Sequence, residues 1–113
     1  MTTTNKDKKM ATALGADLAF YALGGVPSEA ELAMRPKIEN WQVVIAKVGN
    51  VNALAVKGKI FRSKAAPEDG WRFLSRPVIW FDRRHRFIRC AESLYELGRQ
   101  VGQVERGQEI RSD

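Results

Sequence analysis

The sequence is poor in the residues that most catalytic and metal sites require. Its 113 residues include one cysteine, Cys90, and one histidine, His85. One cysteine excludes an intramolecular disulfide and a cysteine-based zinc site, because both need several thiols. This cysteine usage is typical of a reducing compartment, so we expect a cytoplasmic protein. The chain also contains no Gly-x-x-x-x-Gly-Lys phosphate loop, dinucleotide fingerprint or Gly-x-Ser-x-Gly elbow. We therefore predict a protein that is not an enzyme and needs no cofactor.

Long apolar runs are missing as well. No segment reaches the ~18 uninterrupted apolar residues of a membrane-spanning helix, so we expect no membrane partner. Residues 6–25 combine a basic start with an apolar stretch that ends in small residues, which is the composition of a secretory signal. Asp17 interrupts that stretch and argues against cleavage.

The scarce reactive side chains allow two weak combinations. Cys90 and His85 could act as nucleophile and base, but positions five apart on a strand point to opposite faces. A lone cysteine is more often a small buried hydrophobe. Asp82, His85 and Glu92 could approach a metal ion, yet one histidine with scattered carboxylates matches no familiar ligand spacing. We therefore predict neither a catalytic residue nor a metal site.

What the chain does contain is an excess of positive charge in its middle. Residues 41–90 hold eleven basic and three acidic side chains, whereas residues 1–40 hold five of each and residues 91–113 hold three and five. The whole excess behind the net charge of +6 therefore lies in one segment. Such a segment favours a polyanionic partner, either nucleic acid or an acidic protein surface.

Length and composition predict one small domain. A chain of 113 residues with 44% hydrophobic and 28% charged residues can bury a single core. Both ends are polar and lack periodic apolar residues, so we expect flexible tails over residues 1–11 and 105–113 around a domain of residues 12–104.

Helical signals occur only in the first third of the chain. The apolar spacing of residues 12–23 predicts a first helix, and Gly24-Gly25 follows where its C-terminus would lie. Ser28 stands three residues before Glu31, the spacing of a capping box, which predicts a second helix over about 29–35.

After Asn40 the pattern becomes extended. Residues 41–48 and 53–62 are predicted as two strands that meet near Gly49-Asn50 in a hairpin. The two-residue pleat assigns Leu54, Val56, Gly58 and Ile60 to the inner face and Lys57 and Lys59 to the outer face. Residues 72–82 are predicted as a third, central strand, in which Pro77 should face an edge or a bulge because it cannot donate to a ladder.

The segment from residue 86 to residue 105 is open to two interpretations. It can be a hairpin with its turn at Glu92-Ser93. It can equally be a helix, because Leu94, Leu97, Val101 and Val104 would form one stripe.

Four short motifs within residues 14–98 add to this interpretation: GGVPSEAEL at 24–32, Asn40-Trp41, SRPVIWFD at 75–82 and YELG at 95–98. They resemble the pattern of a family of short bacterial proteins of unknown function, mostly alphaproteobacterial. The resemblance implies a single α+β domain and favours the hairpin for residues 86–98, but it implies no activity, cofactor or catalytic residue. Cys90 and the basic turn at 83–85 depart from the family pattern.

We therefore predict an α+β fold with two N-terminal helices packed on a small antiparallel sheet of four or five strands, or a partly open barrel. Ten basic residues between 57 and 89 interleave with Trp71, Phe73, Trp80 and Phe87, which could stack on bases. Eight of them, all except Lys64 and Arg72, are the candidate binding residues: Lys57, Lys59, Arg62, Arg76, Arg83, Arg84, Arg86 and Arg89. The basic turn should lie next to Lys57 and Lys59 if the strands pack in sequence order.

Three functional hypotheses follow from this pattern. The leading one is a small, non-enzymatic accessory or regulatory protein that binds nucleic acid through the basic surface. The alternative is an adaptor or inhibitor whose basic face docks on an acidic protein. A third, a small barrel that binds a metabolite, would need a lined pocket. Oligomeric state cannot be read from the sequence.

Overall fold

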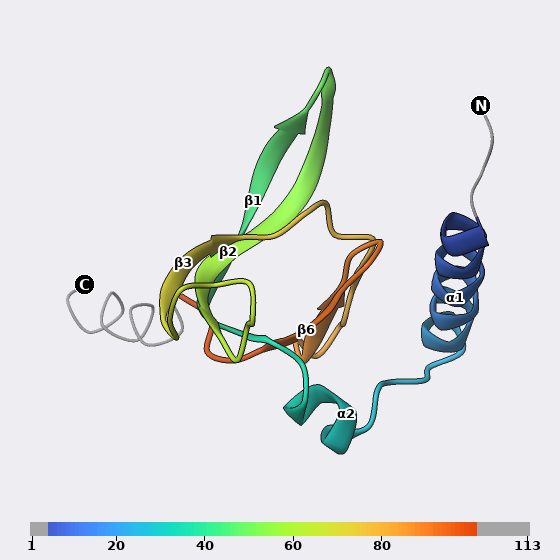
Figure 1. The fold of residues 1–113 in the computed structure, drawn as a ribbon, viewed down its shortest axis with the longest axis horizontal. Helices are drawn as coiled ribbons and strands as arrows, with labels where there is room; N and C mark the ends of the chain where they lie inside the picture. Colours follow the sequence, from blue (N-terminus) through green and yellow to red (C-terminus); the bar gives the residue numbers. More distant parts are fainter. Residues whose placement is uncertain (1–4, 102–113) are drawn as a thin grey trace, which may run out of the picture.

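A computed structural model describes residues 5–101 of the chain, with side chains from residue 11 onward. The fold is α+β, as predicted, with two helices followed by six strands (Figure 1). The predicted C-terminal tail of residues 105–113 lies outside the described residues, as do residues 1–4.

The first helix, α1 (Asn5–Ala22), begins seven residues before the predicted start. Its end is a Schellman motif, in which the Gly25 N–H donates to the Phe20 carbonyl and the Gly24 N–H to the Tyr21 carbonyl, both at 2.9 Å. Gly24 has a φ of 94°, which a side chain would strain. The predicted glycine stop is therefore correct.

The second helix, α2 (Glu29–Ala33), has the predicted N-cap. The Ser28 hydroxyl accepts a hydrogen bond from the Glu31 N–H at 3.1 Å. The Glu31 carboxylate does not return to the cap, because it pairs with Arg35 at 3.2 Å. Only half of the capping box is therefore formed.

The six strands are β1 (Lys37–Val48), β2 (Val51–Phe61), β3 (Trp71–Leu74), β4 (Trp80–Phe81), β5 (Phe87–Arg89) and β6 (Leu94–Leu97). They form one sheet in the order β3-β2-β1-β6-β5-β4, in which β1 and β6 are parallel and the other neighbours are antiparallel. The sheet therefore has six strands instead of the predicted four or five, and one of its five pairings is parallel instead of antiparallel. The sheet is open and does not close into a barrel.

The predicted third strand divides into two strands at opposite edges of the sheet. Residues 75–79, which include Pro77, connect β3 to β4 and carry their own hydrogen bonds. The Val78 N–H donates to the Leu54 carbonyl of β2, and the Ile79 N–H donates to the Arg89 carbonyl of β5, both at 2.8 Å. This connection therefore bridges both halves of the sheet, and neither β3 nor β4 is central.

Residues 86–98 form the hairpin of β5 and β6, so the helical interpretation of this segment is wrong. Phe87 pairs with Glu96 and Arg89 with Leu94. The Cys90 N–H donates to the Ser93 carbonyl at 2.8 Å and closes the turn. The two strands bury side chains on both faces. Phe87 and Leu94 pack with residues of the helices, and Ile88 and Leu97 pack with residues of β1 and β2.

The β1–β2 hairpin extends beyond the other strands and projects from the molecule (Figure 1). It turns at Gly49, whose φ is 61°. The apolar side chains of Val43, Ile45 and Leu54 are exposed on this projecting part. The prediction that Leu54 faces the core is therefore wrong, whereas Val56 and Ile60 are buried as predicted.

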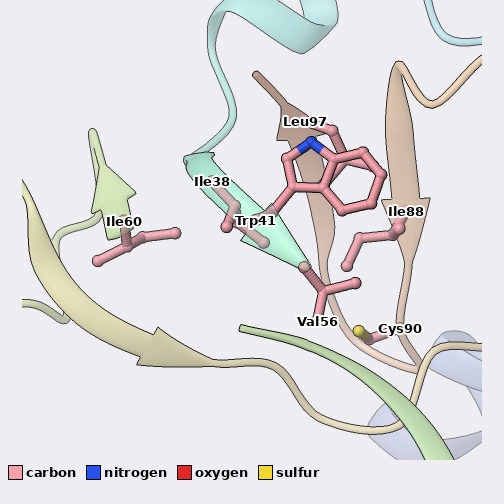
Figure 2. Packing of buried hydrophobic residues seen from close by; sticks show 7 residues of the cluster. All are labelled: Ile38, Trp41, Val56, Ile60, Ile88, Cys90 and Leu97. Carbon is pink, nitrogen blue, oxygen red and sulfur yellow. The ribbon is translucent and has the colours of Figure 1, made fainter. Parts of the chain in front are cut away.

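The core has two parts. The larger one is formed by side chains of β1, β2, β5 and β6 and of the turn after β5. It contains Ile38, Trp41, Val56, Ile60, Ile88, Cys90 and Leu97. In Figure 2 the Trp41 indole lies between Leu97 and Ile88. The smaller part joins the helices to the outer side of β5 and β6 through Tyr21, Leu32, Phe87 and Leu94. Both helices thus pack on the half of the sheet that holds the basic turn.

Candidate functional site

Three basic side chains gather on the outer face of β2 and β3. Lys57 and Lys59 lie two residues apart on β2, so they share a face, and both are exposed. Arg72 of β3 stands directly opposite Lys59 in the register, and Leu74 stands opposite Lys57. We call Lys57, Lys59 and Arg72 the sheet patch. Two like charges placed directly opposite each other on neighbouring strands destabilise the pair, so the arrangement costs folding free energy.

The nearest acidic side chain on the same face does not neutralise this charge. Glu39 of β1 stands opposite Lys59 on its other side. Its carboxylate instead pairs with Lys37 at 3.5 Å and accepts a hydrogen bond from the Arg99 N–H at 3.1 Å. Within residues 11–101 no ion pair involves a sheet-patch cation. The sheet patch is therefore free to contact an anion.

Arg86 is engaged within its own turn. Its backbone N–H and its Nε both donate to Asp82 Oδ2, at 2.9 and 2.8 Å, and its Nη2 donates to Asp82 Oδ1 at 3.2 Å. Burial of Asp82 would raise the pKa of its carboxyl, but these hydrogen bonds outweigh burial and hold that pKa below its ordinary value. Arg86 therefore closes the β4–β5 turn and is not a free binding residue.

Arg62 connects α2 to the sheet. Its guanidinium donates to Glu96 of β6 at 2.6 Å, to the Arg35 carbonyl at 3.1 Å and to the Leu32 carbonyl at 3.4 Å. These carbonyls belong to the C-terminal end of α2, where a cation is favourable. A structural role explains this arginine without a ligand.

Arg89 likewise connects α1 to the sheet. Its guanidinium pairs with Asp17 at 3.4 Å, and its side chain is only 12% exposed. Three of the eight candidates, Arg62, Arg86 and Arg89, thus form internal ion pairs. Within residues 11–101 no ion pair involves the five exposed candidates Lys57, Lys59, Arg76, Arg83 and Arg84.

Arg83 and Arg84 form the tip of the β4–β5 hairpin, and we call this pair the hairpin tip. The turn is closed by the His85 N–H, which donates to the Asp82 carbonyl at 2.9 Å, and His85 adopts a φ of 57°. Its ring contacts the rings of Trp41 and Phe81 edge-on at 5.4 and 5.3 Å.

The hairpin tip and the sheet patch belong to separate parts of the sheet, because β1 and β6 lie between β2 and β5. The strands do not pack in sequence order, so the predicted neighbourhood with Lys57 and Lys59 fails.

The interleaved aromatic residues are mostly core residues. Phe87 is fully buried, Trp80 packs on Tyr21 at 5.7 Å between ring centroids, and Phe73 packs on Tyr95 at 5.2 Å. Trp71 is the exposed member of the set, with 48% of its surface accessible. A row of stacking platforms for successive bases is therefore not formed by these four side chains.

The weak catalytic and metal combinations are also separated. Cys90 and His85 flank opposite ends of β5. Burial raises the pKa of the Cys90 thiol, which donates to the Arg76 carbonyl at 3.5 Å. Among the residues that the structure describes, no three His, Cys, Asp or Glu side chains come together as a metal site would require.

A pocket lies between the end of α1 and the hairpin tip, and the sequence did not reveal it. Its volume is about 280 Å³, and its walls include Tyr21, Gly24, Gly25, Trp80, Arg83 and Arg84. We call it the tip pocket. Gly24-Gly25 and the basic turn are each conspicuous in the sequence, but nothing in the sequence indicates that they meet. Arg72 belongs to the ten interleaved basic residues but not to the eight candidates, and its position opposite Lys59 follows only from the folded register.

No helix among residues 5–101 is long and apolar enough to cross a membrane. Comparison of the chain with protein-family models, curated proteins and solved structures found no match. The resemblance to short bacterial proteins therefore stays a prediction, and the function has to be argued from the chain itself.

Proposed function

We propose that this protein is a non-enzymatic accessory or regulatory protein that binds nucleic acid through the sheet patch. The observation that supports the proposal is the register of Lys59 and Arg72, which places two unpaired cations directly opposite each other on an exposed face. Their repulsion costs stability in the free protein. A row of phosphates would offset that cost, because each cation gains a charged partner.

The proposed contact is with the phosphate backbone and carries no base readout. Phosphate contacts of this kind position a protein on nucleic acid without specifying sequence. Phe87 is buried and Phe73 is half-buried against Tyr95, which supports this mode, since base stacking would need exposed rings. The proposal therefore predicts similar affinities for different sequences of the same length. A cytoplasmic location remains part of the proposal.

A double variant that removes two positive charges, Lys57→Gln with Lys59→Gln, tests the proposal. Since each lost phosphate contact weakens binding and lowers the salt dependence, we expect about a tenfold or larger loss of affinity and a salt slope reduced by about 2. The matched control is Lys47→Gln with Lys64→Gln, which removes the same charge from two exposed lysines outside the sheet patch. Equal losses in the two double variants would show that net charge alone drives the binding.

An acidic protein surface is the second candidate partner, and one observation favours it. Leu74, the last residue of β3, stands opposite Lys57 on the same face as Arg72 and is 57% exposed. An exposed apolar side chain beside two cations suits a protein interface better than a phosphate backbone. If this candidate is correct, Leu74→Ser weakens the interaction with the protein partner, and a pulldown from source cells retains one stoichiometric protein after nuclease treatment. Under the nucleic-acid proposal Leu74→Ser leaves affinity for nucleic acid unchanged.

A further inference from the structure

The tip pocket combines an aromatic wall with free positive charge. Trp80 and Tyr21 form the wall, and they are held together by their own ring contact at 5.7 Å and by the contact of Tyr21 with Phe87 at 5.1 Å. Tyr21 is buried and Trp80 is half-buried, so part of the Trp80 surface remains for a ligand. An aromatic surface of this kind can stack on a planar ring.

The charge at the tip pocket is uneven. Arg83, Arg84 and Arg86 line it together with Asp82, which gives three positive charges against one negative. The negative charge of Asp82 is already paired with Arg86, which donates three hydrogen bonds to the Asp82 carboxylate. Arg83 and Arg84 are exposed, and within residues 11–101 no ion pair includes either of them. Two guanidinium groups are therefore available to a ligand.

The end of α1 also faces the tip pocket, and its dipole opposes an anion. A helix C-terminus carries roughly half a negative charge. The Schellman hydrogen bonds of Gly24 and Gly25 already satisfy the carbonyls of Tyr21 and Phe20, which reduces this effect. Two full positive charges exceed what remains, so the pocket favours an anionic ligand.

The pocket is small. A Cβ atom on Gly25 would overlap the ring of Phe20, so a side chain at this position would need that ring to move. The volume of about 280 Å³ lies just below the ~300–1,000 Å³ of typical small-molecule sites. The ligand is therefore a small molecule or the end of a chain, and not an internal stretch of nucleic acid.

From these observations we infer that the tip pocket binds a nucleoside monophosphate, with the phosphate on Arg83 and Arg84 and the base against Trp80. Guanidinium groups suit this ligand because they form charge-assisted hydrogen bonds with phosphate oxygens. The nucleotide can be free or can be the terminal nucleotide of a strand, since both present the same chemistry. This site is separate from the sheet patch and does not depend on it.

Titration of the ¹⁵N-labelled full chain with adenosine and cytidine 5′-monophosphate, followed by amide chemical shifts, tests the inference. We expect saturable shifts concentrated at residues 21–26 and 80–86, and much weaker binding of inorganic phosphate or of adenosine alone. Shifts spread over the sheet patch to the same extent, equal affinity for inorganic phosphate, or no saturation at millimolar nucleotide would overturn the inference.

Two double variants separate this site from the nucleic-acid surface. Arg83→Gln with Arg84→Gln should lower affinity for the monophosphates about tenfold or more, whereas Lys57→Gln with Lys59→Gln should leave it unchanged. The reverse pattern would contradict the inference. Because both pairs are exposed, unchanged amide shifts elsewhere in the chain check that the fold is intact.

A comparison of 5′-phosphorylated and 5′-hydroxyl DNA decamers identifies the source of the nucleotide. A preference for the phosphorylated decamer that Arg83→Gln with Arg84→Gln abolishes assigns the pocket to a strand end. Equal binding of both decamers, together with monophosphate binding, assigns it to free nucleotides. If the monophosphates bind and no decamer does, the result supports monophosphate binding at the tip pocket and contradicts the proposed nucleic-acid function.

Discussion

At the scale of single residues, Asp82 holds the β4–β5 turn together. It is 5% exposed, and its carboxylate accepts three hydrogen bonds from Arg86. Asp82→Asn removes the charge and replaces one acceptor oxygen with a donor. We expect the free energy of unfolding at pH 7 to fall by about 1–3 kcal/mol, as for other hydrogen bonds to charged groups. Urea unfolding of the two proteins measures this difference.

The difference between Asp82 and its amide should depend on pH. The pKa of Asp82 in the folded protein lies below the ordinary value of 3.8. A lowered pKa stabilises the folded state at pH values above the unfolded pKa, and this stabilisation is lost as pH falls through the folded pKa. Wild type and Asp82→Asn should therefore converge as pH falls from 6 toward the folded pKa of Asp82. A stability gap that stays constant over this range would show that the Asp82 charge is not its source.

Sequence could not sort the eight candidate residues by role. Arg86 and Arg84 are both arginines of the same turn, yet Arg86 reaches the Asp82 carboxylate and Arg84 lies at the exposed tip. Arg62 and Arg89 obtain their partners Glu96 and Asp17 from elements far away in the chain. The sequence shows which residues are basic and predicts that they lie near the surface. Only the tertiary contacts decide whether a basic side chain is paired within the protein or available to a ligand.

At the scale of elements, the bulge in β1 explains a glycine in β2. The register between the two strands shifts between Glu39 and Gln42, where Asn40 has a φ of 51°. A Cβ atom on Gly58 would lie 2.6 Å from the Glu39 carbonyl oxygen and 3.1 Å from the Trp41 Cα. The backbone therefore leaves no room for a side chain at this position.

Gly58→Ala should destabilise the protein by about 1–3 kcal/mol, as overpacking of a filled site usually does. Gly15→Ala is the matched control, because a Cβ on Gly15 meets nothing within 4 Å and alanine favours the helix. We expect this control to be neutral or stabilising by up to about 1 kcal/mol. Thermal unfolding measures both, and equal melting temperatures for the two variants would contradict the role given to Gly58.

The local sequence pattern predicted most of the helices and strands but not the order of the strands in the sheet. The glycine stop of α1, the Ser28 cap and the β1–β2 hairpin follow from residues near one another in sequence. The parallel pairing of β1 with β6 joins residues about sixty positions apart and leaves no local trace. The division between β3 and β4 could have been suspected from Pro77, but the placement of the two strands at opposite edges depends on the folded sheet.

At the scale of the whole molecule, the fold separates the basic segment into distinct surfaces. The excess charge of residues 41–90 appears continuous in the sequence. In the folded chain, part of it holds the helices to the sheet, part forms the sheet patch and part lines the tip pocket. The observed division allows a long polyanion and a small phosphate ligand to bind independently.

The most direct test of the central claim is the salt dependence of nucleic-acid binding. Fluorescence anisotropy of labelled single-stranded DNA, duplex DNA and RNA would be measured against nuclease-treated protein between about 50 and 200 mM salt. The three sheet-patch cations predict a plot of log K against log salt with a slope of about −2 to −3, and little dependence on sequence. No binding at about 50 mM salt, or a slope near zero, would contradict the account and turn attention to an acidic protein partner.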